Sequence, residues 1–289
     1  YTLLTISFVS FRLSAQITNQ GEATVAPETI VSMVSDFDNT PSGEFFNDGN
    51  IYIYGHFNND GVVDFYQNTG LTQFTGGSDQ NISGAKVSYL YDVYFNNSSN
   101  TVPFKVSGSI DISGEADFYN GILDNDNYGG KITFNTDAFH INTSDYSHVD
   151  GPVNKFGNTE FTYPIGDGGF YRFAGISAPS NTAAIFEGKF YFENSDVLYP
   201  HKFKAGVIQE IDNQEYWTIK KESSTNEEML ITLSWRDVTT PQPMIDAAQR
   251  DALTIVRWNP DTNMWVDEGG AINLEAQTIT TAVNGYGVF

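Results

Sequence analysis

The chain has 289 residues, with 14 Lys and Arg against 36 Asp and Glu, a formal net charge of −22, and no cysteine. The negative charge argues against nucleic-acid binding and against attachment to an anionic membrane surface, because both of these partners are negatively charged themselves. The lack of cysteine excludes disulfides, thiolate metal sites and a cysteine nucleophile. The 26 glycines and 15% aromatic residues, with only 17% charged residues, favour strands and tight turns over helices.

Residues 1–16 are typical of the end of a secretory signal peptide, since an apolar run is followed by small residues around Ala15. The alternative interpretation of this segment is a first β-strand. No later stretch of sequence has the roughly 20 apolar residues of a membrane-spanning helix. We therefore expect an extracellular or cell-surface protein that is exported through the periplasm and is not itself inserted in a membrane.

Residues 17–158 contain short runs with apolar or aromatic residues at alternate positions, each closed by Asn, Asp or Gly. Examples are Gly43–Gly49, Asn50–Gly55 and Val62–Tyr66. Strands this short bury their apolar side chains if successive coils stack on one another, which predicts a parallel β-helix with Asn and Gly at its corners. The alternative is a sandwich of hairpins, in which Asn59-Asp60-Gly61 would be a hairpin turn.

Residues 159–289 contain longer alternating strands, and we predict that they form an antiparallel β-sandwich. The four tryptophans, Trp217, Trp235, Trp258 and Trp265, are expected mainly in its core. Pro243–Ala252 is the one good helical candidate, and Gly285–Phe289 resembles a strand in progress, so we expect the natural chain to continue. The expected strands are 182–192, 206–211, 215–220, 228–235, 253–258, 264–266 and 276–281. The predicted fold is thus all-β, a β-helix followed by a β-sandwich.

The joint between the two parts is the stretch Phe161–Arg172, which is rich in glycine. Its glycines lack the Lys-Ser/Thr ending of a phosphate-binding loop, so we interpret them as turn residues. We expect Pro164, Gly166, Asp167 and Gly168 to lead the chain out of the last coil. Arg172 is the first arginine after residue 12, and we predict that it pairs with a carboxylate at the junction.

Several segments resemble one family of proteins. They are Asn47–Gly61, Asp79–Gly84, Val106–Ser113, Gly121–Leu123, Val149–Val153, Phe161–Asp167 with Tyr171-Arg172, and Glu215–Trp217. In this order they resemble the large secreted surface proteins of Bacteroidota that are adhesin-like, associated with gliding motility and exported by the type IX secretion system. The resemblance covers nearly the whole chain and involves structural segments rather than catalytic ones.

The resemblance implies a non-enzymatic cell-surface protein. Its implied partners are the secretion machinery or outer-membrane surface proteins, and glycans are a further candidate. The proteins that this chain resembles look like ones that end in a secretion-sorting domain. Residues 1–289 contain no such domain. We expect no cofactor other than calcium.

A polysaccharide-active enzyme on the same β-helix is the alternative. Such an enzyme needs clustered carboxylates, with a basic residue or calcium to stabilise developing charge, and its two catalytic carboxylates would lie about 5 to 9.5 Å apart in a groove. Residues 17–158 contain no arginine and only four lysines, Lys86, Lys105, Lys131 and Lys155. The four histidines lack the spacing of metal ligands.

A third possibility is a carbohydrate-binding module supported by calcium. Asp36 and Asp38, and likewise Asp124 and Asp126, place carboxylates at alternate positions, where oxygen ligands could converge on one ion. The simpler interpretation is solvated turn residues. Exposed tyrosines could stack on sugar rings, although rings packed within a solenoid would use the same residues. These tyrosines are Tyr52, Tyr54, Tyr66, Tyr89, Tyr91 and Tyr94.

Overall fold

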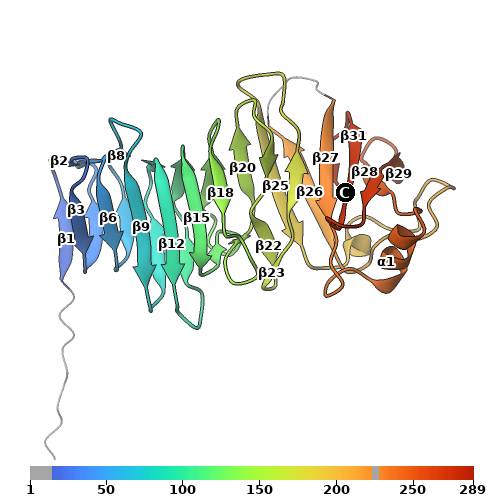
Figure 1. Cartoon of the computed structure of the whole chain (residues 1–289), viewed down its shortest axis with the longest axis horizontal. Coiled ribbons are helices and arrows are strands. Elements are labelled where there is room, and N and C mark those ends of the chain that lie inside the picture. Colours follow the sequence, from blue (N-terminus) through green and yellow to red (C-terminus); the bar gives the residue numbers. More distant parts are fainter. Residues whose placement is uncertain (1–14, 223–227) are drawn as a thin grey trace, which may run out of the picture.

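The computed structural model describes residues 15–222 and 228–289. The fold is nearly all β, with 49% strand and 4% helix, and its N-terminal part is a β-solenoid of about seven coils. Figure 1 shows the coils stacked side by side from the blue end of the chain, followed by the yellow to red terminal strands. The predicted signal peptide falls almost wholly on residues 1–14, outside the described residues.

Successive coils of the solenoid contribute strands to three parallel sheets, which we name A, B and C, and the first six coils contribute one strand to each. Sheet A contains β1 (Gln16–Asn19), β4 (Asp36–Asn39), β7 (Phe57–Asn59), β10 (Gln80–Ser83), β13 (Phe104–Val106), β16 (Leu123–Asp124), β19 (Val149–Asp150) and β22 (Ile165–Asp167). Sheet B contains β2 (Glu22–Val25), β5 (Glu44–Asn47), β8 (Val62–Asp64), β11 (Val87–Leu90), β14 (Ser109–Ile112), β17 (Lys131–Phe134) and β20 (Val153–Phe156). Sheet C contains β3 (Ile30–Met33), β6 (Asn50–Ile53), β9 (Leu71–Gly76), β12 (Asp92–Asn97), β15 (Glu115–Asn120) and β18 (Phe139–Ile141).

The predicted β-helix is therefore present, and the hairpin alternative is wrong. β7 and β8, on either side of Asn59-Asp60-Gly61, belong to different sheets rather than to one hairpin. Parallel pairing puts equivalent residues of successive coils next to one another, as with Phe37 and Phe57. Apolar side chains at alternate positions therefore form continuous rows inside the coils.

Aromatic rings form the centre of the solenoid core. The ring centroids of Phe57 and Phe74 lie 5.7 Å apart, those of Phe74 and Phe95 5.8 Å, and those of Phe95 and Phe118 5.4 Å. All four side chains are fully buried. Contacts at these distances add to the stabilisation that comes from apolar burial.

Buried asparagines form a ladder at the corner between sheets A and B. Asn19 donates from Nδ2 to Oδ1 of Asn39 (2.9 Å), and Asn39 donates in the same way to Asn59 (2.8 Å). Asn59 then donates to Oγ of Ser88 (3.0 Å). Gly84, with φ of 120°, completes the corner, since a Cβ there would lie 2.1 Å from the carbonyl oxygen of Asn59. The repeated Asn and Gly of the sequence thus have a common structural role.

Residues 159–289, which we name the terminal unit, continue the solenoid with antiparallel strands. β25 (Ile185–Tyr191), β26 (Tyr216–Lys221) and β32 (Gly287–Val288) extend sheet B beyond β20. A separate terminal sheet has the order β21 (Phe161–Thr162), β24 (Ala174–Ile176), β27 (Met229–Ser234), β31 (Thr278–Val283) and β30 (Ala271–Asn273). β28 (Ile255–Asn259) and β29 (Met264–Gly269) pair with each other. One hydrophobic core runs from Val25 to Phe289 across the expected boundary at 158 and 159.

The joint is built around a hairpin at the end of sheet A. β22 is followed by β23 (Phe170–Tyr171), which pairs with it antiparallel. Gly168 and Gly169, with φ of 60° and 82°, form the two-residue loop, whose positive φ values match the twist of a hairpin. Pro164 precedes β22, Gly166 lies within this strand, and Asp167 is its last residue. The Asp167 carboxylate accepts a hydrogen bond from the backbone N–H of Phe192 at 2.8 Å.

Most of the strands expected in the terminal unit are present, but the strand expected at 206–211 is wrong. This segment is a loop. Ile208 and Ile211 are both buried against Tyr216, Trp265 and Val288. Residues three apart point to opposite faces of a strand, so burying both side chains in one cluster requires a bent backbone.

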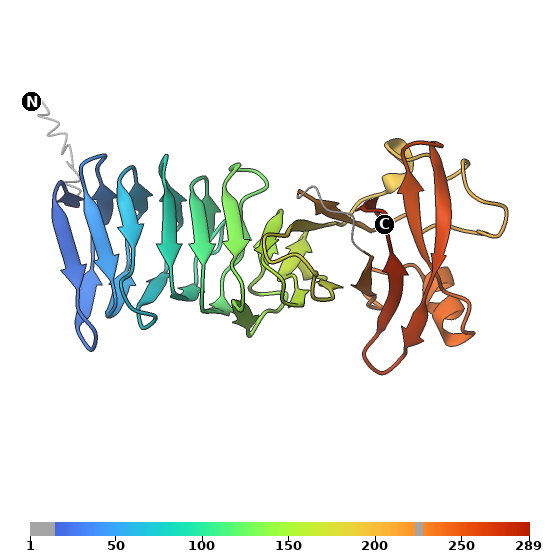
Figure 2. The same ribbon diagram turned by 90° about the horizontal axis from the view of Figure 1, so that it is seen from above.

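The terminal unit contains two short helical segments. The predicted helix at 243–252 is present as α1 (Gln242–Gln249), with proline in its first turn. A 3-10 segment, η1 (Ser195–Val197), lies in the long connection between β25 and β26. Trp217, Trp235 and Trp265 are buried as expected, and Trp258 is half-buried. Figure 2 shows the terminal unit as the end of an elongated molecule, opposite the first coils.

Candidate functional site

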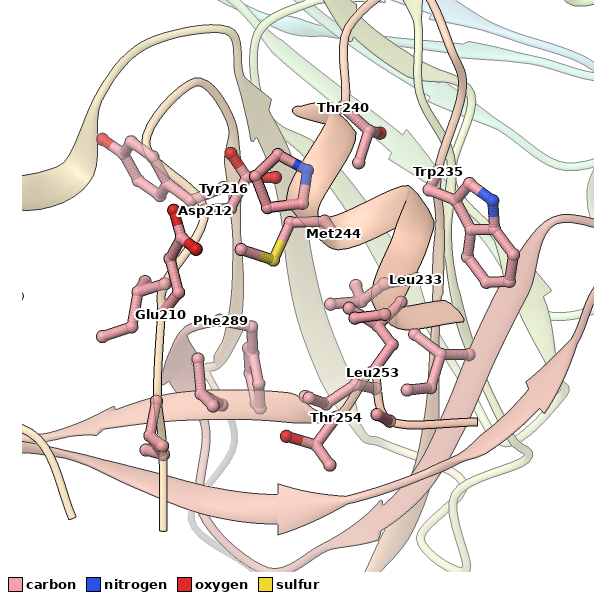
Figure 3. Close-up of a pocket in the computed structure, with 18 of the residues that line it drawn as sticks. Glu210, Asp212, Tyr216, Leu233, Trp235, Thr240, Met244, Leu253, Thr254 and Phe289 are labelled. Carbon is pink, nitrogen blue, oxygen red and sulfur yellow. The ribbon is translucent and has the colours of Figure 1, made fainter. Parts of the chain in front are cut away.

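A cavity lies in the terminal unit, and we name it the terminal cavity. It has a volume of about 590 Å³, within the range of ligand-binding pockets. Its walls come from the loop 207–212, from α1 and the segment that follows it, and from the ends of β26, β27 and β31. The loop that replaces the expected strand at 206–211 is therefore one wall of the cavity (Figure 3).

Most of the cavity wall is apolar. Leu233 projects from β27, Met244 from α1, and Leu253 from the segment before β28, while Phe289 closes the wall below. Phe289 is fixed by two backbone hydrogen bonds with Trp217, at 2.9 and 3.0 Å. Apolar walls of this kind favour ligands with an apolar body, because burying their surface removes it from water.

One side of the cavity is acidic. Figure 3 shows the carboxylates of Glu210 and Asp212 on the side away from Leu233 and Leu253. Glu215 lines the same cavity and is almost fully buried. The cavity is thus amphipathic, with apolar walls and a carboxylate-lined side.

Glu215 has a fully buried partner in Arg172. Nη1 of Arg172 lies 2.8 Å from Oε2 of Glu215, and the side chains are 0% and 1% exposed. Arg172 also donates to the hydroxyls of Thr239 and Thr240 and to the carbonyl oxygen of Ser234. The carboxylate expected to pair with Arg172 at the junction is therefore Glu215, and hydrogen bonds satisfy the remaining donors of the guanidinium, as a buried charge requires.

Aromatic rings enclose the Arg172 guanidinium. Its central carbon lies 5.1 Å from the ring centroid of Trp217 and 5.5 Å from that of Phe190. The indole N–H of Trp217 donates to the backbone oxygen of Arg172 at 3.3 Å. These contacts tie β26 of sheet B to the start of the terminal sheet.

Asp212 is a second acidic group at the cavity and has no such cation. Its Oδ1 accepts from the backbone N–H groups of Gln214 (2.8 Å) and Glu215 (3.2 Å). Burial, and then the Glu215 carboxylate, raise the pKa of Asp212 to about 7. Within residues 15–222 and 228–289, Asp212 makes no ion pair.

A second hollow, which we name the side groove, lies on the outer face of sheet A and has a volume of about 430 Å³. It is bounded by the loops 97–103 and 120–122, and by Tyr146, whose side chain is 79% exposed. Asp124 of β16 and Asp150 of β19 line it, and these two residues are register partners on adjacent parallel strands. Neighbouring strands are about 4.8 Å apart, so both carboxylates project from the same face at short separation.

The surroundings of Asp150 favour its neutral form. Burial raises the pKa of Asp150 to about 7, with further contributions from Asp167, Asp124 and Asp126, while Lys189 opposes the shift. A third carboxylate at the groove, Asp145, is bound by Arg236 through oxygen contacts at 2.5 and 2.9 Å. Asp124 and Asp150 are therefore neighbouring carboxyl groups at one groove, and the pKa of Asp150 is raised.

The two pairs of aspartates expected to bind calcium, Asp36 with Asp38 and Asp124 with Asp126, have hydrogen-bond or ion-pair partners within the chain. Asp36 and Asp38 lie on β4, where they accept hydrogen bonds from the backbone N–H of His56 and from Asn58. Asp124 accepts two bonds from Asn127, at 2.9 Å each, and Asp126 pairs with Lys189 at 2.5 Å. In the described part of the chain, no group of three or more His, Asp or Glu residues is arranged to hold a metal ion. Calcium binding stays a prediction.

The tyrosines expected to form a binding row lie in several places. Tyr52 on β6 stacks on Tyr54, with ring centroids 6.5 Å apart, whereas Tyr89 lies on β11 of sheet B. Tyr66 stacks on Phe46 at 4.2 Å, and Tyr91 contacts Phe65 edge to face. Tyr94, on β12, packs against Tyr119 of the next coil. The exposed aromatic at the side groove is instead Tyr146.

The comparisons with known proteins give no family for this chain. No family model matches it, and neither the curated proteins nor the solved structures searched contain a match. No helix in the described residues is long and apolar enough to cross a membrane. Arguments about function therefore depend on the geometry of the terminal cavity and the side groove. Sequence reasoning missed Asp212 and Asp150, because neither belongs to a recognisable motif.

Proposed function

We propose that this chain is a non-enzymatic, extracellular surface protein of the adhesin-like kind. In this proposal the solenoid is a rigid spacer, and the terminal unit is a β-sandwich that makes the specific contacts. The observation that carries the proposal is the continuity of sheet B, whose ten strands run without a break from β2 to β32. A sheet shared by both parts, with one core behind it, fixes the terminal unit rigidly at the end of the rod.

Several other properties support the proposal. The net charge of −22 and the absence of cysteine suit a soluble surface that needs no disulfide. The resemblance to gliding-associated proteins exported by the type IX system suggests the secretion machinery or outer-membrane surface proteins as partners, with glycans as a further class. The terminal cavity provides a place for a small ligand at the far end of the rod.

Binding and turnover measured together test this proposal. The purified chain is incubated with bacterial cells and with a panel of immobilised glycans, and the soluble fraction is assayed for released reducing ends. We expect saturable retention without release of sugar. The variant Ala247→Phe fills the terminal cavity. If this variant is retained as well as the wild type, the contact lies outside the terminal cavity, on the solenoid.

A polysaccharide-active enzyme is the second candidate, and the side groove favours it. Asp124 and Asp150 project from adjacent strands, and a raised pKa on one of two carboxyl groups is the arrangement of a glycosidase acid with its nucleophile. The test is hydrolysis of neutral and acidic polysaccharides by the wild type and by Asp150→Asn, and only activity lost in that variant supports this candidate.

A further inference from the structure

We propose that the terminal cavity binds a small amphiphile that has an apolar body and a positively charged amine. This assigns a ligand class to a cavity that the proposed surface role leaves undefined. The proposal depends on two features of the cavity. One is its apolar wall, and the other is that Glu215 has a cation as its partner whereas Asp212, within the described residues, does not.

The size and lining of the cavity set the apolar part of the ligand. A volume of about 590 Å³ accommodates a short alkyl chain or an aromatic group with its polar head. The side chains of Leu233, Met244, Leu253 and Phe289 are apolar and carry no charge. The flexible thioether of Met244 adapts to ligands of slightly different shape.

The charges on the acidic side of the cavity determine which polar head group the ligand can have. Arg172 neutralises Glu215 through their buried ion pair. Asp212 and Glu210 remain at the cavity, and neither forms an ion pair among the described residues. Arg250 also lines the cavity, and outside the Arg172–Glu215 pair its charge is outnumbered by the carboxylates of Glu210, Asp212, Asp246 and Asp267. An ammonium group entering here gains a carboxylate partner in a partly buried site, and the excess of carboxylates disfavours a carboxylate or phosphate head.

The charge on Asp212 links binding to pH. Burial and the Glu215 carboxylate raise the pKa of Asp212, and Arg172 lowers it. The other titratable or charged residues that line the cavity are Glu210, Tyr216, Asp246, Arg250 and Asp267. Asp212 is neutral below about pH 7 and charged above it. An alkylammonium ion keeps its charge through pH 8, as lysine does with a pKa of about 10.4. Binding should therefore strengthen between pH 5.5 and pH 8.

The experiment measures binding of three probes that differ only in the head group: octylammonium, octanol and octanoate. Titration calorimetry with the whole chain at pH 8 should show saturable binding of octylammonium, at least about tenfold tighter than octanol and tighter still than octanoate. The same titration at pH 5.5 should weaken octylammonium binding and leave octanol binding unchanged.

Variants locate the site. Asp212→Asn should reduce the affinity for octylammonium to that for octanol, and Ala247→Phe on α1 should weaken all three probes. Asp261→Asn, an exposed aspartate in the β28–β29 turn, is the matched control and should behave as the wild type. Each variant is checked by circular dichroism, and the pH dependence of the wild type tests the proposal if Asp212→Asn does not fold. Equal affinities for octylammonium and octanoate, or no saturable binding, would overturn it.

Discussion

The solenoid and the terminal unit bury polar groups in different ways. In the ladder at the corner between sheets A and B, Asn19, Asn39 and Asn59 pass hydrogen bonds from one amide to the next, so the groups of this ladder are neutral. At the start of the terminal unit the buried groups are charged, with Arg172 and Glu215 paired behind the terminal cavity.

This difference follows from repetition. Each coil provides the next coil with an equivalent residue in register, so from Asn19 to Asn59 an amide, which both donates and accepts, bonds to the amide of the next coil, and Asn59 ends the ladder on the hydroxyl of Ser88. The terminal unit has no repeat, and it joins strands of sheet B to those of the terminal sheet. A buried charge with several fixed donors is satisfied in only one arrangement, so we infer that Arg172 specifies how β24, β26 and β27 meet.

The largest effect is expected from Arg172→Met. Removing the guanidinium leaves the Glu215 carboxylate buried without its cation, which should lower the free energy of unfolding by about 3–5 kcal/mol. Denaturant titration measures the change. Lys220→Met is the matched control, because the Lys220–Glu187 pair is nearer the surface, with side chains 51% and 20% exposed, and should contribute only about 0–1 kcal/mol. Similar losses in both variants would contradict the special role of the buried pair.

A smaller effect is expected from Asn39→Ala in the ladder. This change removes the acceptor of Asn19 and the donor to Asn59. Leaving buried amide groups unsatisfied should cost about 1–3 kcal/mol. Asn58 precedes Asn59 on β7 and lies on the outer face. It donates hydrogen bonds to Asp38 and Asp60 at a site where water can replace its amide group. Asn58→Ala should therefore cost less, and the reverse order in unfolding measurements would argue against the ladder.

The smallest effect is expected from Asp150→Asn, and it should depend on pH. The folded-state pKa of about 7 lies above that of an unfolded aspartate, near 3.9. The native state therefore binds more protons between these two values, and this carboxyl group lowers stability as pH rises through that window. The variant should equal the wild type at pH 4 and exceed it at pH 8. The difference between the two pKa values, about 3, corresponds to about 4 kcal/mol at most, and solvent screening of this partly exposed carboxyl group reduces the expected difference in stability to on the order of 1 kcal/mol. If Asp150→Asn and the wild type have the same pH profile in thermal unfolding, the pKa of Asp150 is not raised in the folded state.

The solenoid could be predicted from sequence because its signals are local and repeated. Short alternating runs closed by Asn and Gly indicate stacked coils, and 243–252 has the composition of a short helix. The loop at 206–211 could not be predicted, since its alternation resembles a strand and only the packing of Ile208 and Ile211 against Trp265 bends it.

The two candidate sites were predicted only in part. Asp124 was recognised from its alternation with Asp126, but its neighbour in space is Asp150, 26 positions later in the chain and brought beside it by the coil register. Arg172 was recognised because arginine is rare in this chain, whereas Glu215 and Asp212 carry no local signal. Residues that depend on which coils or strands become neighbours are the ones that sequence patterns miss.

The most direct test of the account is a single assay of binding and turnover on the whole chain. Labelled protein is mixed with bacterial cells and with soluble polysaccharides, and both the bound fraction and the released reducing ends are measured at pH 6 and pH 8. The account predicts saturable binding and no release at either pH. Release of reducing ends that Asp124→Asn and Asp150→Asn both abolish would contradict it and identify the side groove as an active site.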